Sequence, residues 1–222
     1  MNTMNKKKNV AIVVISSNKG LAGAYNANII KTTLRRIKEN TAKGIHTVVY
    51  PVGQKAISGF KHKSGDYELK EGYTAVANEP TAIGANLIAE AIAKDYVSGK
   101  IDKIDIITTH FNNMMSYNIV DWEILPVKVE KAEIHELDPV MEFDPSASRV
   151  LQQIVPMFIT NSIYQALLEA NASELASRMT AMSAASNNAE EMITTLTIDY
   201  NKARQAAITQ ELVEIVSGAS AI

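Results

Sequence analysis

The residues best placed to do chemistry form a polar turn, Ser16 to Gly23, directly after a buried apolar run. A loop that ends a strand and opens a helix is where α/β folds hold phosphate groups, because helix-start N–H groups are free there. The turn SSNKGLAG contains neither G-x-G-x-x-G nor G-x-x-x-x-G-K-[ST]. We therefore favour a tight turn that uses glycine for its permissive dihedrals. A nucleotide-dependent α/β enzyme stays open as the alternative.

The remaining chemistry-bearing residues show no catalytic or metal-binding spacing. Four histidines fall in separate segments of the chain: His46, His62, His110 and His135. There is no cysteine, which excludes disulfides, thiolate metal sites and cysteine nucleophiles. Glu190 and Glu191 are interpreted as a solvated helix face, and no G-x-S-x-G motif occurs. We expect no catalytic residue, no cofactor and no metal.

Composition excludes two further classes of protein. The 222 residues carry 22 Lys and Arg against 24 Asp and Glu, a net charge of −2, so clustered positive charge for nucleic acid is missing. No apolar run approaches the 18 or so residues that a membrane span requires, and the start MNTMNKKKNV does not resemble a signal peptide. We expect no nucleic-acid partner and membrane contact only through other proteins.

The elements that position these residues alternate between strand and helix in the first half. We predict strands at 10–15, 45–52, 101–109 and 117–127, weak strands at 67–69 and 73–76, and helices at 24–43, from 54, and at 80–97. Such alternation is typical of an α/β fold, with a mainly parallel, Rossmann-like sheet, helices on its faces and one antiparallel edge strand. An acidic segment, 130–144, then breaks the pattern, so we place a domain boundary between 1–143 and 144–222.

The second region lacks helix breakers altogether. There is no glycine or proline from Met157 to Ser217, and a continuous helix of that length would extend roughly 90 Å. A domain of about 150 residues has a radius of gyration near 15 Å. We therefore expect a long helix that projects from the first domain.

Apolar residues recur along that helix at alternating steps of four and three. The positions are Leu168, Ala172, Leu175, Met179, Met182, Ser186, Ala189, Ile193, Leu196, Tyr200, Ala203 and Ala207, of which only Ser186 is polar. This heptad pattern, here called the seam, is typical of a left-handed coiled coil. Its methionines could form an adaptable binding surface, although core packing is the favoured interpretation. No other predicted helix matches its length, so the seam lacks a partner.

Three strings of this sequence resemble one family. The segments YNKARQAAITQELVEIVSGASAI (200–222) and SRMTAMSAASNNAEEMI (177–193) closely resemble the end of the gamma subunit of F-type ATP synthases. The segment VAIVVISSNKGLAGAYNANI (10–29) is similar to that family's first strand, turn and helix, and Pro156 and the Tyr164 region also agree. The turn departs from the commoner pattern at Asn18-Lys19 and at Ala22-Gly23, where the family's usual cysteine is missing.

The resemblance implies a non-catalytic rotor of the central stalk in a proton-translocating synthase. Its partners would be the alpha and beta subunits of the catalytic ring, the epsilon subunit and the membrane c-ring. By family motif, Arg178, Arg204, Gln205, Thr209 and Glu211 match positions that contact catalytic subunits. The expected location is peripheral, on the cytoplasmic face of a bacterial cell membrane.

Gamma subunits usually begin with a long helix antiparallel to the C-terminal one, and in this sequence the first strand begins near residue 10. We expect that absence to explain the unpaired seam, whether it reflects truncation or divergence. A generic coiled-coil adaptor that self-associates through 168–207 remains a third hypothesis.

Overall fold

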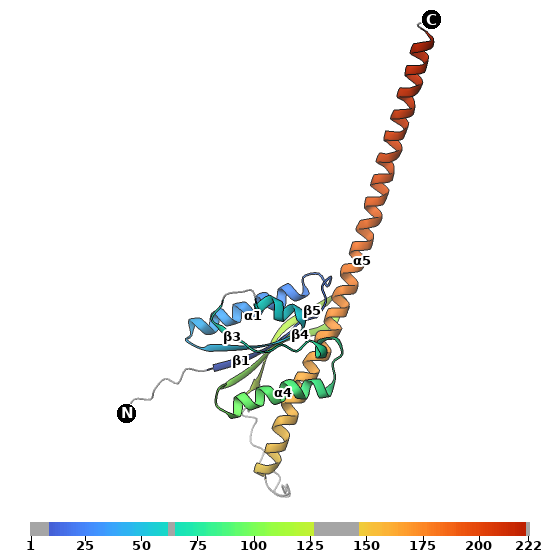
Figure 1. Cartoon of the computed structure of the whole chain (residues 1–222). Helices are drawn as coiled ribbons and strands as arrows, with labels where there is room; N and C mark the ends of the chain where they lie inside the picture. The colour runs from blue at the N-terminus through green and yellow to red at the C-terminus, as the bar shows by residue number, and fades with distance from the viewer. Residues whose placement is uncertain (1–8, 62–64, 127–146, 221–222) are drawn as a thin grey trace. The chain divides into compact units, whose positions relative to one another are not determined.

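The computed structural model describes residues 9–61, 65–126 and 147–220, and the chain divides into two compact units, 1–180 and 181–222 (Figure 1). The predicted boundary at 143/144 and the acidic segment 130–144 lie outside the described residues. Each unit is treated separately below.

The first unit is built on a five-stranded sheet. Its strands are β1 (Asn9–Ile15), β2 (His46–Val52), β3 (Tyr67–Leu69), β4 (Lys103–Asn113) and β5 (Ser116–Leu125). Their order is β3-β2-β1-β4-β5. The pairs β2–β3, β1–β2 and β1–β4 are parallel, and only β5 pairs antiparallel, through its hairpin with β4. The predicted mainly parallel sheet with an antiparallel edge strand is confirmed.

Helices follow the strands as the apolar periodicity predicts, with one exception. They are α1 (Tyr25–Ala42), α2 (Gln54–Lys61), α3 (Ala75–Asn78) and α4 (Ala82–Val97). The strand predicted at 73–76 is wrong, because Tyr73 makes a single parallel bridge to Val52 and the chain then turns into α3. Helix α4 begins after Pro80, where the Thr81 hydroxyl accepts a hydrogen bond from the Gly84 N–H.

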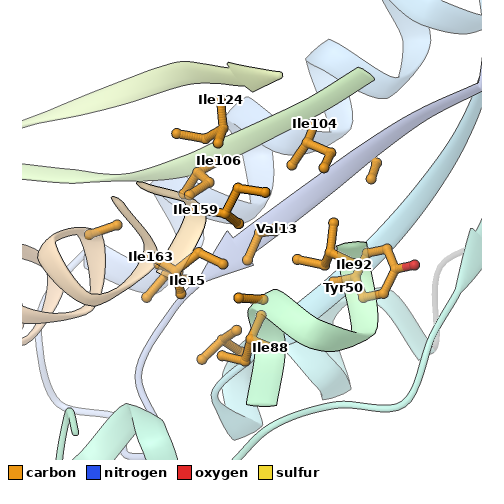
Figure 2. Packing of buried hydrophobic residues seen from close by; sticks show 14 of the residues in the cluster. Val13, Ile15, Tyr50, Ile88, Ile92, Ile104, Ile106, Ile124, Ile159 and Ile163 are labelled. Atoms are coloured by element: carbon orange, nitrogen blue, oxygen red, sulfur yellow. The ribbon is translucent and has the colours of Figure 1, made fainter. Parts of the chain in front are cut away.

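The sheet is buried on both faces, which explains why β1 reads as a continuous apolar run. Alternate β1 residues contribute to two separate cores: Ala11, Val13 and Ile15 face one, and Val10, Ile12 and Val14 face the other. Helices α1 and α2 cover the second core. Figure 2 shows the first core, where helix residues pack beside strand isoleucines, with Ile88 and Ile92 from α4 and Ile159 and Ile163 from a later helix.

That later helix is α5 (Ala147–Ala219), of 73 residues with Pro156 inside it. Its part within the first unit packs on the sheet through Ile159, Ile163, Ala166, Leu167 and Ala170, all buried. This packing was not predicted, because the long helix was expected to project from the first domain. A second apolar stripe at 159, 163, 166 and 170 was the signal that could have revealed it.

In the second unit α5 continues from residue 181 to Ala219, and all its side chains there except Ala181 are exposed. Such a helix has no packing of its own to hold it, since most helical stability in proteins comes from burying an apolar face. This exposed part of α5 is therefore suited to binding a partner molecule.

Candidate functional site: two faces of the long helix

The turn after β1 lies at the point where the sheet order reverses, between β1 and β4. In open α/β sheets ligands bind in the crevice at this edge. Here Leu167 and Ala170 of α5 lie in the crevice against Ile15 and Ser16, and the cavity that remains among them is about 10 Å³. That volume is about the minimum for one water molecule. Beside this filled part, a cavity of about 290 Å³ remains between the turn, at Ser17 to Lys19, and Asn171, Glu174 and Arg178 of α5.

Within the turn the left-handed conformation falls on Gly23, at φ 56°, and also on Leu21, at φ 63°. Glycine thus supplies one of the two left-handed positions of the turn, and a leucine supplies the other. Leu21 is 75% exposed, so neither burial nor backbone preference accounts for a leucine at this position.

Arg178 joins this turn to α5. Its Nη1 donates to Glu174 Oε2 at 3.0 Å, its Nη2 contacts Glu174 Oε1, and Nη2 also donates to the Gly20 carbonyl at 3.5 Å. Glu174 is buried, and burial raises its pKa in spite of the Arg178 guanidinium beside it. Arg178 is therefore engaged within its own chain, and its predicted contact with a catalytic subunit stays a prediction.

The histidines are scattered in the structure as in the sequence. His110 Nδ1 lies 2.5 Å from Glu169 Oε2 on α5, and His46 Nε2 lies 3.9 Å from Glu68 Oε2. His62 and His135 lie outside the described residues. Among the residues that are described, no three His, Asp or Glu side chains converge on a possible metal site.

The seam is exposed along its length. Its large residues are between 42% and 67% exposed: Leu168, Leu175, Met179, Met182, Ile193, Leu196 and Tyr200. In the part of the chain that the structure describes, the next longest helix is α1, with 18 residues, and it covers the sheet. Monomeric proteins rarely leave so long an apolar stripe in water, so the stripe marks an interaction surface.

The candidate contact residues of the second unit occupy two faces of α5. At about 100° per residue, Arg204 and Glu211 share a face about 60° from the seam positions Tyr200, Ala203 and Ala207. Gln205 and Thr209 share a face about 170° from the seam. The Thr209 hydroxyl donates to the Gln205 carbonyl at 2.8 Å, and all four side chains are exposed. A helix lying in the seam would therefore leave Gln205 and Thr209 uncovered.

The α/β domain buries one face of α5 against its sheet and leaves the apolar seam exposed, an arrangement typical of a structural protein that presents a helix to partners. Within the described residues, none of the helices is long and apolar enough to cross a lipid bilayer.

Comparison with known proteins identifies the family to which the chain belongs. The family model of ATP synthase matches residues 1–222. The ATP synthase gamma chain of Gloeothece citriformis is 36% identical over 246 residues, covering 99% of this chain and 78% of that one. The gamma chain of Thermobifida fusca is 40% identical over 222 residues, covering 96% and 72%.

Solved structures agree with this assignment. The central stalk and c-ring structure of Tetrahymena thermophila mitochondrial ATP synthase matches with a TM-score of 0.65 at 26% identity, over 83% of this chain and 79% of that one. A Euglena gracilis mitochondrial ATP synthase chain matches with a TM-score of 0.67 at 17% identity, which supports the fold. The chain belongs to the ATP synthase gamma-chain family. It is a central-stalk subunit of a membrane-associated F-type ATP synthase and is not itself catalytic.

Proposed function

We propose that this chain is the rotor through which ion flow at a membrane c-ring drives conformational change in a ring of alpha and beta subunits. The observation that carries the proposal is the exposed seam of α5, whose spacing suits a second helix, on a helix that packs against the sheet of the α/β domain. In this proposal the translocated ion is the proton, the epsilon subunit also binds the chain, and the complex lies on the cytoplasmic face of a bacterial membrane.

A rotor acts on catalytic sites only through contacts that depend on its orientation. A partner shifts the equilibrium of a site by its differential interaction energy with the site's conformations. Gln205 and Thr209, on the face opposite the seam, are the residues best placed for such contacts. Arg204 and Glu211 flank the seam and would contact either the ring or the edge of the paired helix.

Arg178 has a different role in the proposal. Its guanidinium joins Glu174 and the Gly20 carbonyl, so its contribution to ring contacts would come from donors left over by these bonds. Arginine carries five N–H donors, which leaves capacity for a partner carboxylate.

The test is reconstitution. A helix complementary to the seam, taken from the N-terminal part of the Thermobifida fusca gamma chain, is joined to this chain and assembled with alpha and beta subunits. We expect ATP hydrolysis well above that of the ring alone. Gln205→Ala with Thr209→Ala should lower the rate of hydrolysis about tenfold. That factor corresponds to a loss of about 1.4 kcal/mol in the difference between the rotor's interaction free energies with the two conformations of a catalytic site.

The matched control is Thr194→Ala with Thr195→Ala, which removes two hydroxyls that bond to Glu190 and Glu191 carbonyls on the same exposed helix. The control should hydrolyse ATP at more than half the parent rate. Equal losses in the two variants would show that the helix, and not the 205/209 face, carries the effect. Failure of the parent chain to assemble would count against the rotor itself.

A further inference from the structure

In the first unit the seam and the sheet-packing face lie on opposite sides of α5. The buried positions Ile159, Ile163, Ala166, Leu167 and Ala170 average about 170° around the helix from the four seam positions between 168 and 179, at 100° per residue. Whatever fixes the sheet face of α5 therefore also fixes the direction in which the seam points.

Apolar packing alone fixes that direction poorly, because it is non-directional. Ala166 and Ala170 are buried in this contact, where small side chains allow the sheet to approach the helix backbone. A helix sliding by one residue would advance about 1.5 Å and turn by about 100°.

Two buried hydroxyl groups select particular carbonyls of α5. Thr108 Oγ1 of β4 donates to the Ala166 carbonyl at 3.2 Å. Tyr25 Oη, at the start of α1, donates to the Ala170 carbonyl at 2.9 Å and lies 3.2 Å from Thr109 Oγ1. The side chains of Tyr25, Thr108 and Thr109 are at most 1% exposed.

The geometry points to Tyr25 and Thr108 as positioning residues that set the register of α5 on the sheet and thereby the direction in which the seam positions from 168 to 179 point. In a slipped register both hydroxyls would lose their acceptors in a place that water does not reach, which costs more than losing a surface hydrogen bond. The hydrogen bond between Thr160 and Asn86 is exposed and can be replaced by water, and the part-buried bond from Arg178 to the Gly20 carbonyl is long, at 3.5 Å.

For the stalk, the register of α5 would set where a paired helix lies. This consequence rests on the proposed function, since it requires a helix that pairs with the seam. The register itself does not depend on that proposal. The register can be measured in the isolated chain, so the register proposal and the rotor proposal can be refuted independently of each other.

The chain contains no cysteine, which permits a register test by pairwise cross-linking. Thr160 Oγ1 lies 3.3 Å from Asn86 Oδ1, so Asn86→Cys with Thr160→Cys reports the observed register. Asn86→Cys with Asn161→Cys reports a slip of one residue. Each pair is oxidised in the full-length chain and the rates of disulfide formation are compared.

We expect the first pair to react much faster than the second in the parent chain. Tyr25→Phe with Thr108→Val should lower that ratio by about 25-fold, at roughly fivefold for each buried hydrogen bond. The matched control is Tyr50→Phe with Thr33→Val, which removes two bonds that do not involve α5, to Asp95 and to the Ile29 carbonyl. Its ratio should stay at the parent value.

An unchanged ratio in the Tyr25/Thr108 variant, or an equal fall in the control, would overturn the proposal. If circular dichroism shows the double variant to be unfolded, each single variant is measured instead. Each should lower the ratio by about fivefold, and a ratio equal to the parent's in both would be equally decisive against it.

Discussion

At the scale of single residues, the polar groups of this chain hold its parts together. Asp95 is an example, at the end of α4. It accepts a hydrogen bond from Tyr50 Oη at 2.7 Å, and its carboxylate lies 3.5 Å from Lys70 Nζ and 3.4 Å from Lys100 Nζ. The Tyr50 hydrogen bond, with the two lysines, lowers the pKa of the Asp95 carboxyl.

A lowered carboxyl pKa in the folded state stabilises the protein above the unfolded pKa, near 4, and the stabilisation is lost as the pH falls through the folded pKa. We predict that Tyr50→Phe costs about 1 kcal/mol of unfolding free energy at pH 7. The cost should begin to shrink below pH ~4 and should be lost as the pH falls through the lowered folded-state pKa of Asp95, where the carboxyl is protonated in both proteins. Urea unfolding from pH 7 to pH 3 measures it, and a cost that does not vary with pH would contradict the assignment.

At the scale of elements, α5 performs two tasks on two faces, and the sequence made only one of them visible. The heptad seam was predicted because its spacing is unbroken over twelve positions. The sheet-packing face was missed because it is short and because Ala166 and Ala170 carry little hydrophobic signal. Likewise, the weak strand predicted at 73–76 overlaps the start of α3. Four residues are too few to distinguish the helical period of 3.6 residues from the strand period of two.

The alanines of the sheet face should be intolerant of added volume. We predict that Ala166→Leu destabilises the first unit by about 1–3 kcal/mol, because Ala166 is fully buried against β4. Ala189→Leu, at an exposed seam position of the second unit, is the matched control and should be nearly neutral. Thermal unfolding followed by circular dichroism compares them. Equal effects at the two sites would mean that α5 does not pack as described.

The mainly parallel sheet and its antiparallel edge strand were predictable, because a continuous β-branched run and a run with a hairpin partner differ in pattern. The position of α5 in the crevice after β1 was not predictable, since it depends on residues 167 and 170 meeting Ile15 across about 150 residues of chain. The engagement of Arg178 with the Gly20 carbonyl was hidden for the same reason.

At the scale of the whole molecule, stability is distributed unevenly between the two units. The first unit has two buried cores, whereas the second has α5 alone with exposed side chains. A single helix without packing is marginally stable in water. The isolated chain should therefore lose helix in two stages on heating.

We predict an early, broad loss of ellipticity from 181–222, followed by a cooperative transition of the first unit. Deleting 181–222 should abolish the early phase and leave the midpoint of the later one within a few degrees. A single transition in the full chain, or a large fall in that midpoint after truncation, would mean that the units do not unfold separately.

The central claim, that this chain turns inside a catalytic ring, is tested most directly by watching it turn. A cysteine introduced at the exposed Lys61 of α2 is the only thiol and can carry a bead. The chain with its paired helix is assembled into a surface-fixed ring of alpha and beta subunits, and ATP is added. The account predicts sustained rotation of the bead in one direction, which stops when ATP is removed. ATP hydrolysis at the full rate with a stationary bead would contradict it.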